Sequence, residues 1–272
     1  ELHDFVSSFA FTPTDAQSSA ISTILDDMAR GEPMGRLLEG DVGSGKTFVA
    51  AVVAYAALHT RKTKNGLGST GAGQRLQVAY MAPTEILAKQ HFESFIEFFK
   101  GTDIEIGLLT GSGCKKFPSK SGDGDTTDVS RAQLLKWLAD GRVSIVIGTH
   151  ALIQKTVQFA SLALIIIDEQ HRFGVKQRAA LSRKTSSTNN NESAKVPHLL
   201  SMTATPIPRT LALTLFGDLE LTVIDTMPKN RKRIITEIVK SSKRDETYEL
   251  VRKELQAGRQ VYVICPRIDE QD

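Results

Sequence analysis

The stretch RLLEGDVGSGKTFVA, residues 36–50, joins a short apolar run, a glycine-rich turn and the start of an alanine-rich helical run. It matches the pattern G-x-x-x-x-G-K-[S/T], with a strand before it and a helix after it, as a phosphate-binding loop requires. The glycines let the backbone approach phosphate oxygens closely, and N–H groups at the helix start attract an anion. A chance glycine-rich turn is the alternative, which the flanking elements disfavour.

This loop contains the first candidate site residues. Lys46 offers a positive charge to the β- and γ-phosphates, and the Thr47 hydroxyl is placed to reach Mg²⁺. The sequence therefore predicts a site for a Mg²⁺-nucleotide. The loop residues expected to bind it are Gly40, Gly43, Ser44, Gly45, Lys46 and Thr47.

A second stretch, LALIIIDEQHRF at residues 162–173, runs an apolar strand directly into Asp168 and Glu169. Burying a charge is costly unless the charge is paired or bound to metal. The two carboxylates therefore either cap an exposed strand end or belong to a site that needs negative charge. With the Lys46 loop, the second interpretation is favoured. Asp168 would hold Mg²⁺, partly through water, and Glu169 would take a proton from the attacking water. The candidate catalytic residues are Glu169, Lys46 and Asp168, and the candidate metal ligands are Thr47 and Asp168.

Short apolar runs alternate with helical patterns along the chain. Such runs predict strands buried on both faces, and so a doubly wound α/β fold, a parallel sheet with helices on both faces. The expected strands are 36–39, 76–81, 104–109, 144–147, 162–167, 198–202 and 221–224. The expected helices are 15–29, 46–59, 85–99, 131–139, 175–181 and 209–216. Polar stretches at 61–75, 115–129 and 184–196 are expected to be surface loops.

Composition sets few limits on function. The chain has 272 residues and a net charge of +3, which permits a nucleic-acid partner without requiring one. Basic residues crowd at 229–233, where a solvated face and phosphate contact are equally plausible. The two cysteines, Cys114 and Cys265, form no disulfide framework. With no signal peptide and no membrane-length apolar run, a cytoplasmic protein without a membrane partner is expected.

A domain boundary is expected near Pro228–Arg233. After it, a strand at 234–239, a helix at 244–257 and a strand at 260–265 are expected, which are too few elements for an independent domain. We therefore predict one domain at 1–228 and the truncated start of a second at 229–272.

Further motifs narrow the class of nucleotide-binding protein. The strings MAPTEILAKQH (81–91), VIGTHALIQ (146–154), DEQH (168–171) and SMTATPIPRTL (201–211) occur in this order. This set resembles superfamily-two helicases over essentially the whole chain. The longer strings GDVGSGKT, DEQHRFGVKQR, TATPIPRTLAL and GDLE are similar to the RecG family of bacterial DNA branch-migration helicases. The transcription-repair coupling factors share part of this pattern.

The resemblance implies a RecA-like helicase ATP-binding domain at 1–228 and the start of a second RecA-like domain from 229. It implies ATP and Mg²⁺ at Lys46, Thr47, Asp168 and Glu169, with Gln17 reading the adenine. A solvated helix position is the alternative for Gln17. Residues expected near the nucleic-acid backbone are Thr84, Glu85, Gly148, Thr149 and His150. For Thr84, a helix N-cap is an alternative that is compatible with this role. Residues expected to couple the sites are Gln170, His171, Thr203, Thr205 and Arg209.

The implied function is an ATP-dependent DNA helicase or translocase that remodels branched DNA such as stalled forks and Holliday junctions. Its partners would be double-stranded and branched DNA, and the protein would be a monomer. The alternatives are a transcription-repair coupling translocase and a nucleotide- or DNA-binding module that is inactive in isolation. Family members carry a wedge domain and two complete motor domains, and we expect the wedge and most of the second motor to lie outside this sequence. Because a second-domain arginine can contribute several orders of magnitude in rate, we expect weak nucleotide binding and slow or no hydrolysis by these 272 residues.

Overall fold

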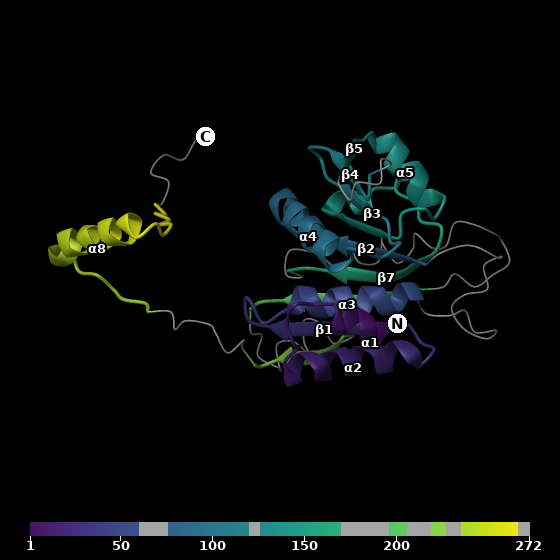
Figure 1. Ribbon diagram of the computed structural model, residues 1–272, viewed down its shortest axis with the longest axis horizontal. Coiled ribbons are helices and arrows are strands. Elements are labelled where there is room, and N and C mark those ends of the chain that lie inside the picture. The colour runs from purple at the N-terminus through teal and green to yellow at the C-terminus, as the bar shows by residue number, and fades with distance from the viewer. Residues whose placement is uncertain (60–75, 120–125, 170–195, 206–218, 227–234, 266–272) are drawn as a thin grey trace. The chain divides into compact units, whose positions relative to one another are not determined.

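The structure is a computed structural model that describes residues 1–59, 76–119, 126–169, 196–205, 219–226 and 235–265 (Figure 1). The chain divides into two compact units, Glu1–Lys229 and Asn230–Asp272. The division falls beside the boundary expected from the sequence, although the functional division between the two units stays a prediction. Among the described residues no helix is long and apolar enough to cross a membrane.

The first unit is built on one sheet, which has nine strands within the described residues. The strand order is β5-β4-β3-β6-β2-β7-β8-β1-β9. All neighbours pair in parallel except β3 with β4 and β4 with β5. The strands are β1 Gly35–Gly40, β2 Gln77–Met81, β3 Ile106–Leu109, β4 Cys114–Phe117, β5 Thr127–Val129, β6 Ile145–Gly148, β7 Leu162–Ile167, β8 His198–Thr203 and β9 Glu220–Ile224.

Side chains of the central strands alternate between two apolar cores, one on each face. Val78 and Tyr80 join the core under the helices α2 (Asp15–Ala29), α3 (Lys46–His59) and α4 (Glu85–Phe98). Ala79 and Met81 join the core under α5 (Arg131–Ala139). Both faces are therefore covered, as expected for a doubly wound sheet. The helices of this unit are α1 Leu2–Ser7, α2 Asp15–Ala29, α3 Lys46–His59, α4 Glu85–Phe98, α5 Arg131–Ala139 and the 3₁₀ turn η1 His150–Ile153.

The segment 115–129 corrects the sequence interpretation, which expected a surface loop there. It contains part of β4 and all of β5, which extend the otherwise parallel sheet in antiparallel pairing. The strand β4 was missed because Lys115 and Lys116 lie within it, and charged residues are typical of surface loops. Lys116 is buried, pairs with Glu105 at 3.0 Å and lies 5.6 Å from the ring centroid of Trp137, so its charge is compensated inside the fold. Helix α1 was also not predicted, and Phe5 on it is buried.

The second unit differs from expectation. The helix α8 Arg244–Gln256 forms close to its expected place, preceded by the 3₁₀ turn η4 Ser241–Lys243. The strands expected at 234–239 and 260–265 are wrong, since no described residue of either segment is in a strand. A strand needs a hydrogen-bonded neighbour, and Ile238 and Ile264 are 98% and 93% exposed. The expected helices 175–181 and 209–216, the loop 61–75 and most of the loop 184–196 lie outside the described residues.

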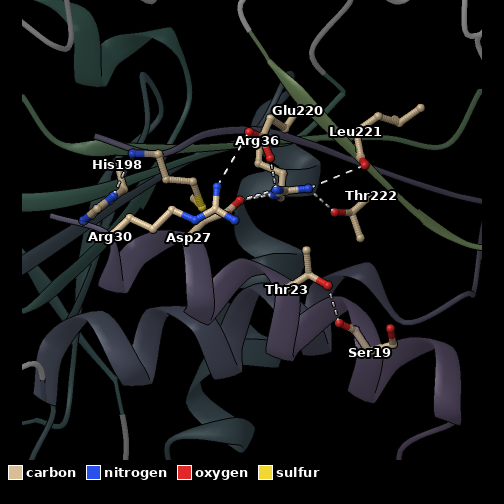
Figure 2. Close-up of polar contacts among 10 residues, drawn as sticks. Ser19, Thr23, Asp27, Arg30, Arg36, His198, Glu220, Leu221 and Thr222 are labelled. Atoms are coloured by element: carbon tan, nitrogen blue, oxygen red, sulfur yellow. Dashed lines mark hydrogen bonds and ion pairs between the residues drawn. The ribbon is translucent and has the colours of Figure 1, made fainter. Parts of the chain in front are cut away.

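A buried ion-pair network fastens the edge strand β9 to the rest of the sheet (Figure 2). Arg36 on β1 donates from Nε to Asp27 Oδ2 on α2 at 2.6 Å and from Nη1 to the Thr222 hydroxyl on β9 at 2.7 Å. Arg36 also pairs with Glu220, while Arg30 lies 3.0 Å from the other Asp27 oxygen. Arg36 and Asp27 are only 4% and 6% exposed, so their charges are stabilised by each other and by these partners in place of water.

Candidate functional site

The phosphate loop follows β1 and ends at the first residue of α3. Gly43 and Gly45 adopt φ of 83° and 91°, in the left-handed region that favours glycine. A Cβ on Gly45 would lie 2.2 Å from Gln17 Nε2, so a side chain there would displace the Gln17 amide. The Lys46 ammonium donates to the carbonyl oxygens of Gly40 at 2.5 Å and Asp41 at 3.0 Å. The loop is therefore wrapped around the amino end of α3, as the sequence predicted.

Gln17 lies against this loop and not on a solvated helix face. Its side-chain oxygen accepts from the Thr14 N–H at 2.9 Å, completing a capping box, and its Nε2 donates to the Ser44 carbonyl at 2.8 Å. Gln17 is 5% exposed. The amide therefore joins the start of α2 to the phosphate loop. Its reading of adenine stays a prediction.

The two carboxylates follow β7, two strands from β1 in the sheet. The Asp168 backbone N–H donates to Met81 O at 2.8 Å, and its side chain is buried. Glu169 has a φ of 51°, a left-handed conformation that a non-glycine residue adopts at a cost of about 1–3 kcal/mol. Such strain at a strand end is common where a side chain must be aimed. Capping of an exposed strand end does not describe Asp168.

The charge of Lys46, after β1, interacts with the two carboxylates after β7. Burial lowers the pKa of the Lys46 ammonium, while the negative charges of Asp168, Glu169 and Asp41 oppose this shift. Lys46 is thus held between the loop and the carboxylates, and its charge is stabilised by them. An ammonium beside two carboxylates is complementary to a nucleoside triphosphate with a bound cation.

The sequence analysis missed a buried polar cluster behind Asp168. His91 on α4 lies with Nε2 2.8 Å from Asp168 Oδ2, and Tyr80 on β2 places its hydroxyl 3.4 Å from both His91 ring nitrogens. Complete burial and the nearby charge of Asp168 raise the Tyr80 pKa well above its ordinary value, while the Thr47 side chain opposes this shift. One signal was available. In α4 the histidine shares the buried face with Ala88, Phe92 and Phe95, where a polar residue needs a partner.

The expected coupling residues are only partly described. Thr203 ends β8 opposite Glu39, and its hydroxyl lies 3.0 Å from that of Thr205. Ala204, between them, lines a cavity of about 310 Å³ with Gly40 and Ser44 of the phosphate loop. The turn 203–205 therefore lies beside the loop, and it follows β8, which pairs with β7, the strand that Asp168 follows. Gln170, His171 and Arg209 lie outside the described residues.

A second cavity, of about 270 Å³, gathers most of the residues expected near nucleic acid. We call it the edge pocket. It lies where β2, β3 and β6 end, and it also contains Arg131 at the start of α5, which the sequence analysis missed. Arg131 Nη2 donates to Gln154 Oε1 at 2.8 Å. The lining residues are Pro83, Thr84, Glu85, Gly111, Arg131, Thr149, His150, Ala151 and Gln154.

Several edge-pocket residues also have local structural roles. Thr84 caps α4 by accepting from the Leu87 N–H at 3.3 Å, and Thr149 caps η1. Glu85 Oε1 accepts from the N–H groups of Gly111 and Ser112 at 2.8 and 3.1 Å. The Ser112 side chain and these N–H groups lower the Glu85 pKa, so the carboxylate stays charged and holds the turn after β3.

Gly148, the one residue of the predicted nucleic-acid set that does not line the edge pocket, has a packing reason to be glycine. A Cβ there would lie 2.4 Å from the carbonyl oxygen of Leu109, because β6 pairs with β3 at this point. The nucleic-acid roles of Gly148, Thr149, His150, Thr84 and Glu85 stay predictions.

The residues present fit a magnesium ion that arrives with a nucleotide. Mg²⁺ keeps several waters and binds through one or two protein oxygens plus substrate phosphates. Among the described residues, each Asp168 oxygen accepts one hydrogen bond, from His91 or from the Glu169 N–H at 3.1 Å, and a carboxylate oxygen has a second lone pair that suits a water on the metal. No cluster of three or more metal-ligating side chains occurs in the described part of the chain.

Comparison with known proteins gives consistent matches. Residues 14–214 match the model of the DEAD/DEAH box helicase family. The chain is 45% identical over 272 residues to the ATP-dependent DNA helicase RecG of Bacillus subtilis (strain 168), covering 100% of this chain and 35% of that protein. It is 42% identical to the ATP-dependent DNA helicase RecG of Thermotoga maritima, covering 99% of this chain and 30% of that protein. The chain thus spans about a third of the length of these relatives.

Solved structures agree with these matches. A structure of RecG bound to a three-way DNA junction is similar over 94% of this chain and 30% of that one, with a TM-score of 0.68 and 38% identity. A DEAD box protein from Methanococcus jannaschii is similar in fold over 82% of this chain and 53% of that one, with a TM-score of 0.50 and 18% identity.

Proposed function

Because this chain belongs to the DEAD/DEAH box helicase family, we propose that it is the ATP-binding motor domain of an ATP-dependent DNA helicase that acts on branched DNA. The observation that carries this proposal is that β1 and β7 run parallel in the sheet, so Lys46 and Thr47 after β1 and Asp168 and Glu169 after β7 lie at the same edge. These are the groups that phosphoryl transfer from a nucleotide requires, with cations facing phosphates and a carboxylate facing water. The relatives named ATP-dependent DNA helicase support the choice of DNA.

In the proposed mechanism each group has one task. The N–H groups of the loop 40–47 and the Lys46 ammonium bind the phosphates, and Thr47 and Asp168 would hold Mg²⁺. When bound, the metal neutralises developing charge on the phosphate oxygens. Glu169 accepts the proton of the attacking water. Thr203 and Thr205, beside the loop, are placed to sense the phosphate that is cleaved.

The edge pocket supports a nucleic-acid contact that positions without reading sequence. Hydroxyls and helix N-termini suit phosphate oxygens, and Arg131 adds a positive charge. The similarity to a structure of RecG bound to a three-way DNA junction leads us to propose branched DNA as the partner.

Hydrolysis under single-turnover conditions tests the proposal. The chain in excess over radiolabelled ATP and Mg²⁺ would be mixed with no DNA, with a three-way junction, or with a linear duplex of the same base composition. We expect slow hydrolysis that the junction accelerates more than the duplex does. Nucleotide retained without hydrolysis, with or without DNA, would instead support a binding module.

A further inference from the structure

The buried cluster behind Asp168 has a geometry that phosphate chemistry alone does not explain. Asp168 Oδ2 and His91 Nε2 are 2.8 Å apart, and the two side chains are 12% and 11% exposed. A carboxylate in such a dry position is stabilised by a donor more strongly than one in water. The other carboxylate oxygen accepts from the Glu169 N–H, so both oxygens are held and the plane of the group is fixed.

The tautomer of His91 follows from its two neighbours. Because Nε2 faces a carboxylate, Nε2 carries the hydrogen and donates it, which leaves Nδ1 as the acceptor. The Tyr80 hydroxyl, 3.4 Å away, is the group that can donate to Nδ1. The ring centroids of Tyr80 and His91 are 4.8 Å apart, so the tyrosine also limits rotation of the imidazole.

Helix α4 holds the imidazole from the other side. Phe92 and Phe95, on the same face of the helix, are 2% and 0% exposed, and they anchor α4 to the apolar core on the face of the sheet over β3 and β6. Thr84 at the N-cap of this helix lines the edge pocket. From Glu85 to His91 the helix rises about 9 Å, at about 1.5 Å per residue. One rigid element therefore connects the edge pocket with the Asp168 carboxylate.

We propose that His91 is a positioning residue, which donates from Nε2 to Asp168 and so holds that carboxylate in the orientation that receives the metal of a bound nucleotide. The inference rests on the proposed function, because it takes Asp168 as the metal-binding acid. The partners of a metal-ligating carboxylate commonly change metal affinity by about 10–100-fold when they are removed. His91 would act only through Asp168 and would not touch the nucleotide.

Nucleotide affinity measured with and without metal tests the proposal in the 272-residue chain. A fluorescent ADP analogue is titrated in Mg²⁺ and again in EDTA, and the ratio of the two dissociation constants gives the metal-dependent part of the affinity. In His91→Phe, which keeps a ring but removes the donor, we expect this ratio to fall by about 10-fold with the EDTA value unchanged. His91→Gln, whose amide can replace Nε2–H, should recover most of the ratio. General loss of structure would instead weaken binding in both solutions.

Matched controls define the outcome. Gln90→Ala, an exposed neighbour on α4, and His198→Asn, at a buried histidine on β8, should leave the ratio unchanged. Asp168→Asn gives the effect of losing the carboxylate. If Asp168→Asn lowers the metal-dependent ratio but His91→Phe leaves it at the wild-type value, the positioning role of His91 is overturned and the proposed function is not. Equal ratios in wild type and Asp168→Asn would overturn the metal assignment of the proposed function, and the inference with it.

Tyr80→Phe gives a second test, which is needed if His91→Phe does not melt cooperatively. It removes one oxygen atom from a filled core and takes away the donor to Nδ1. We expect the metal-dependent ratio to fall several-fold. An unchanged ratio in a folded Tyr80→Phe protein would count against the cluster as a positioning device.

Discussion

The two halves of the sheet's carboxyl edge are built differently. Where β1, β7 and β8 end, charged and polar side chains are buried and held by partners distant in sequence, such as Asp168 by His91 and Gln17 by Ser44. Where β2, β3 and β6 end, the edge pocket is lined by helix caps and by side chains that are mostly exposed or half-buried. Reaction chemistry needs preorganised charges, whereas contact with a regular phosphate backbone needs only correctly placed donors.

Glu169→Gln should give the largest effect, because it should slow the reaction at the nucleotide site and leave DNA binding at the edge pocket unchanged. The amide keeps the size of the side chain but cannot accept a proton, so single-turnover ATP hydrolysis should slow by about 100-fold or more. Affinity for a fluorescent ATP analogue and for junction DNA should stay close to wild type. Wild-type hydrolysis by this variant would show that the strained residue after β7 is not the base.

Asp27→Ala tests whether the buried charge at the start of β1, away from the phosphate loop, has a purely structural role. Removing Asp27 leaves Arg36 buried with only its β9 partners, which should lower the free energy of unfolding by about 3–5 kcal/mol. Urea denaturation followed by circular dichroism measures this change. Arg30→Ala, which removes an exposed partner of the same aspartate, is the control and should cost about 1 kcal/mol or less. Equal effects of the two variants would contradict the network described here.

Arg131→Ala should lower the affinity of the edge pocket for DNA without changing nucleotide binding where β1, β7 and β8 end. Loss of one phosphate contact lowers DNA affinity several-fold for all sequences and reduces the slope of log affinity against log salt by about 1. Fluorescence anisotropy of a labelled junction at several salt concentrations measures both quantities. Arg142→Ala removes the same charge from an exposed position after α5 and serves as the control. An unchanged salt slope in Arg131→Ala would remove this arginine from the nucleic-acid surface.

His198 should give the smallest effect, and it lies at the opposite edge of the sheet from both halves. Burial lowers the pKa of His198, whose Nδ1 accepts from the Met34 N–H at 3.0 Å. Protonation therefore favours the unfolded chain, so this contribution to stability is present above about pH 6.5 and is lost as pH falls toward the folded-state pKa. When the pH is lowered from 7.5 to 5.5, the urea midpoint should fall by less in His198→Asn than in wild type. An equal fall would show that His198 does not carry this dependence.

The parts of this molecule with local causes could be predicted from the sequence. The loop 40–47 has a fixed glycine and lysine pattern, and the apolar runs gave the parallel strands because both faces are buried. The strands β4 and β5 were not predictable, since the charge of Lys116 is compensated only by Glu105 and Trp137 from elsewhere in the fold. For the same reason His91 was missed. Its partner Asp168 is 77 positions away in the chain, and only the pairing of β2 with β7 brings them together.

We infer that the nucleotide site where β1, β7 and β8 end is already assembled in this chain. Titration of the wild-type chain and of Lys46→Ala with a fluorescent ATP analogue in Mg²⁺ tests this inference. We expect saturable binding to wild type that Lys46→Ala weakens by about 100-fold, because the ammonium faces the phosphates in a partly buried site. No binding to either protein, or equal binding to both, would contradict the account.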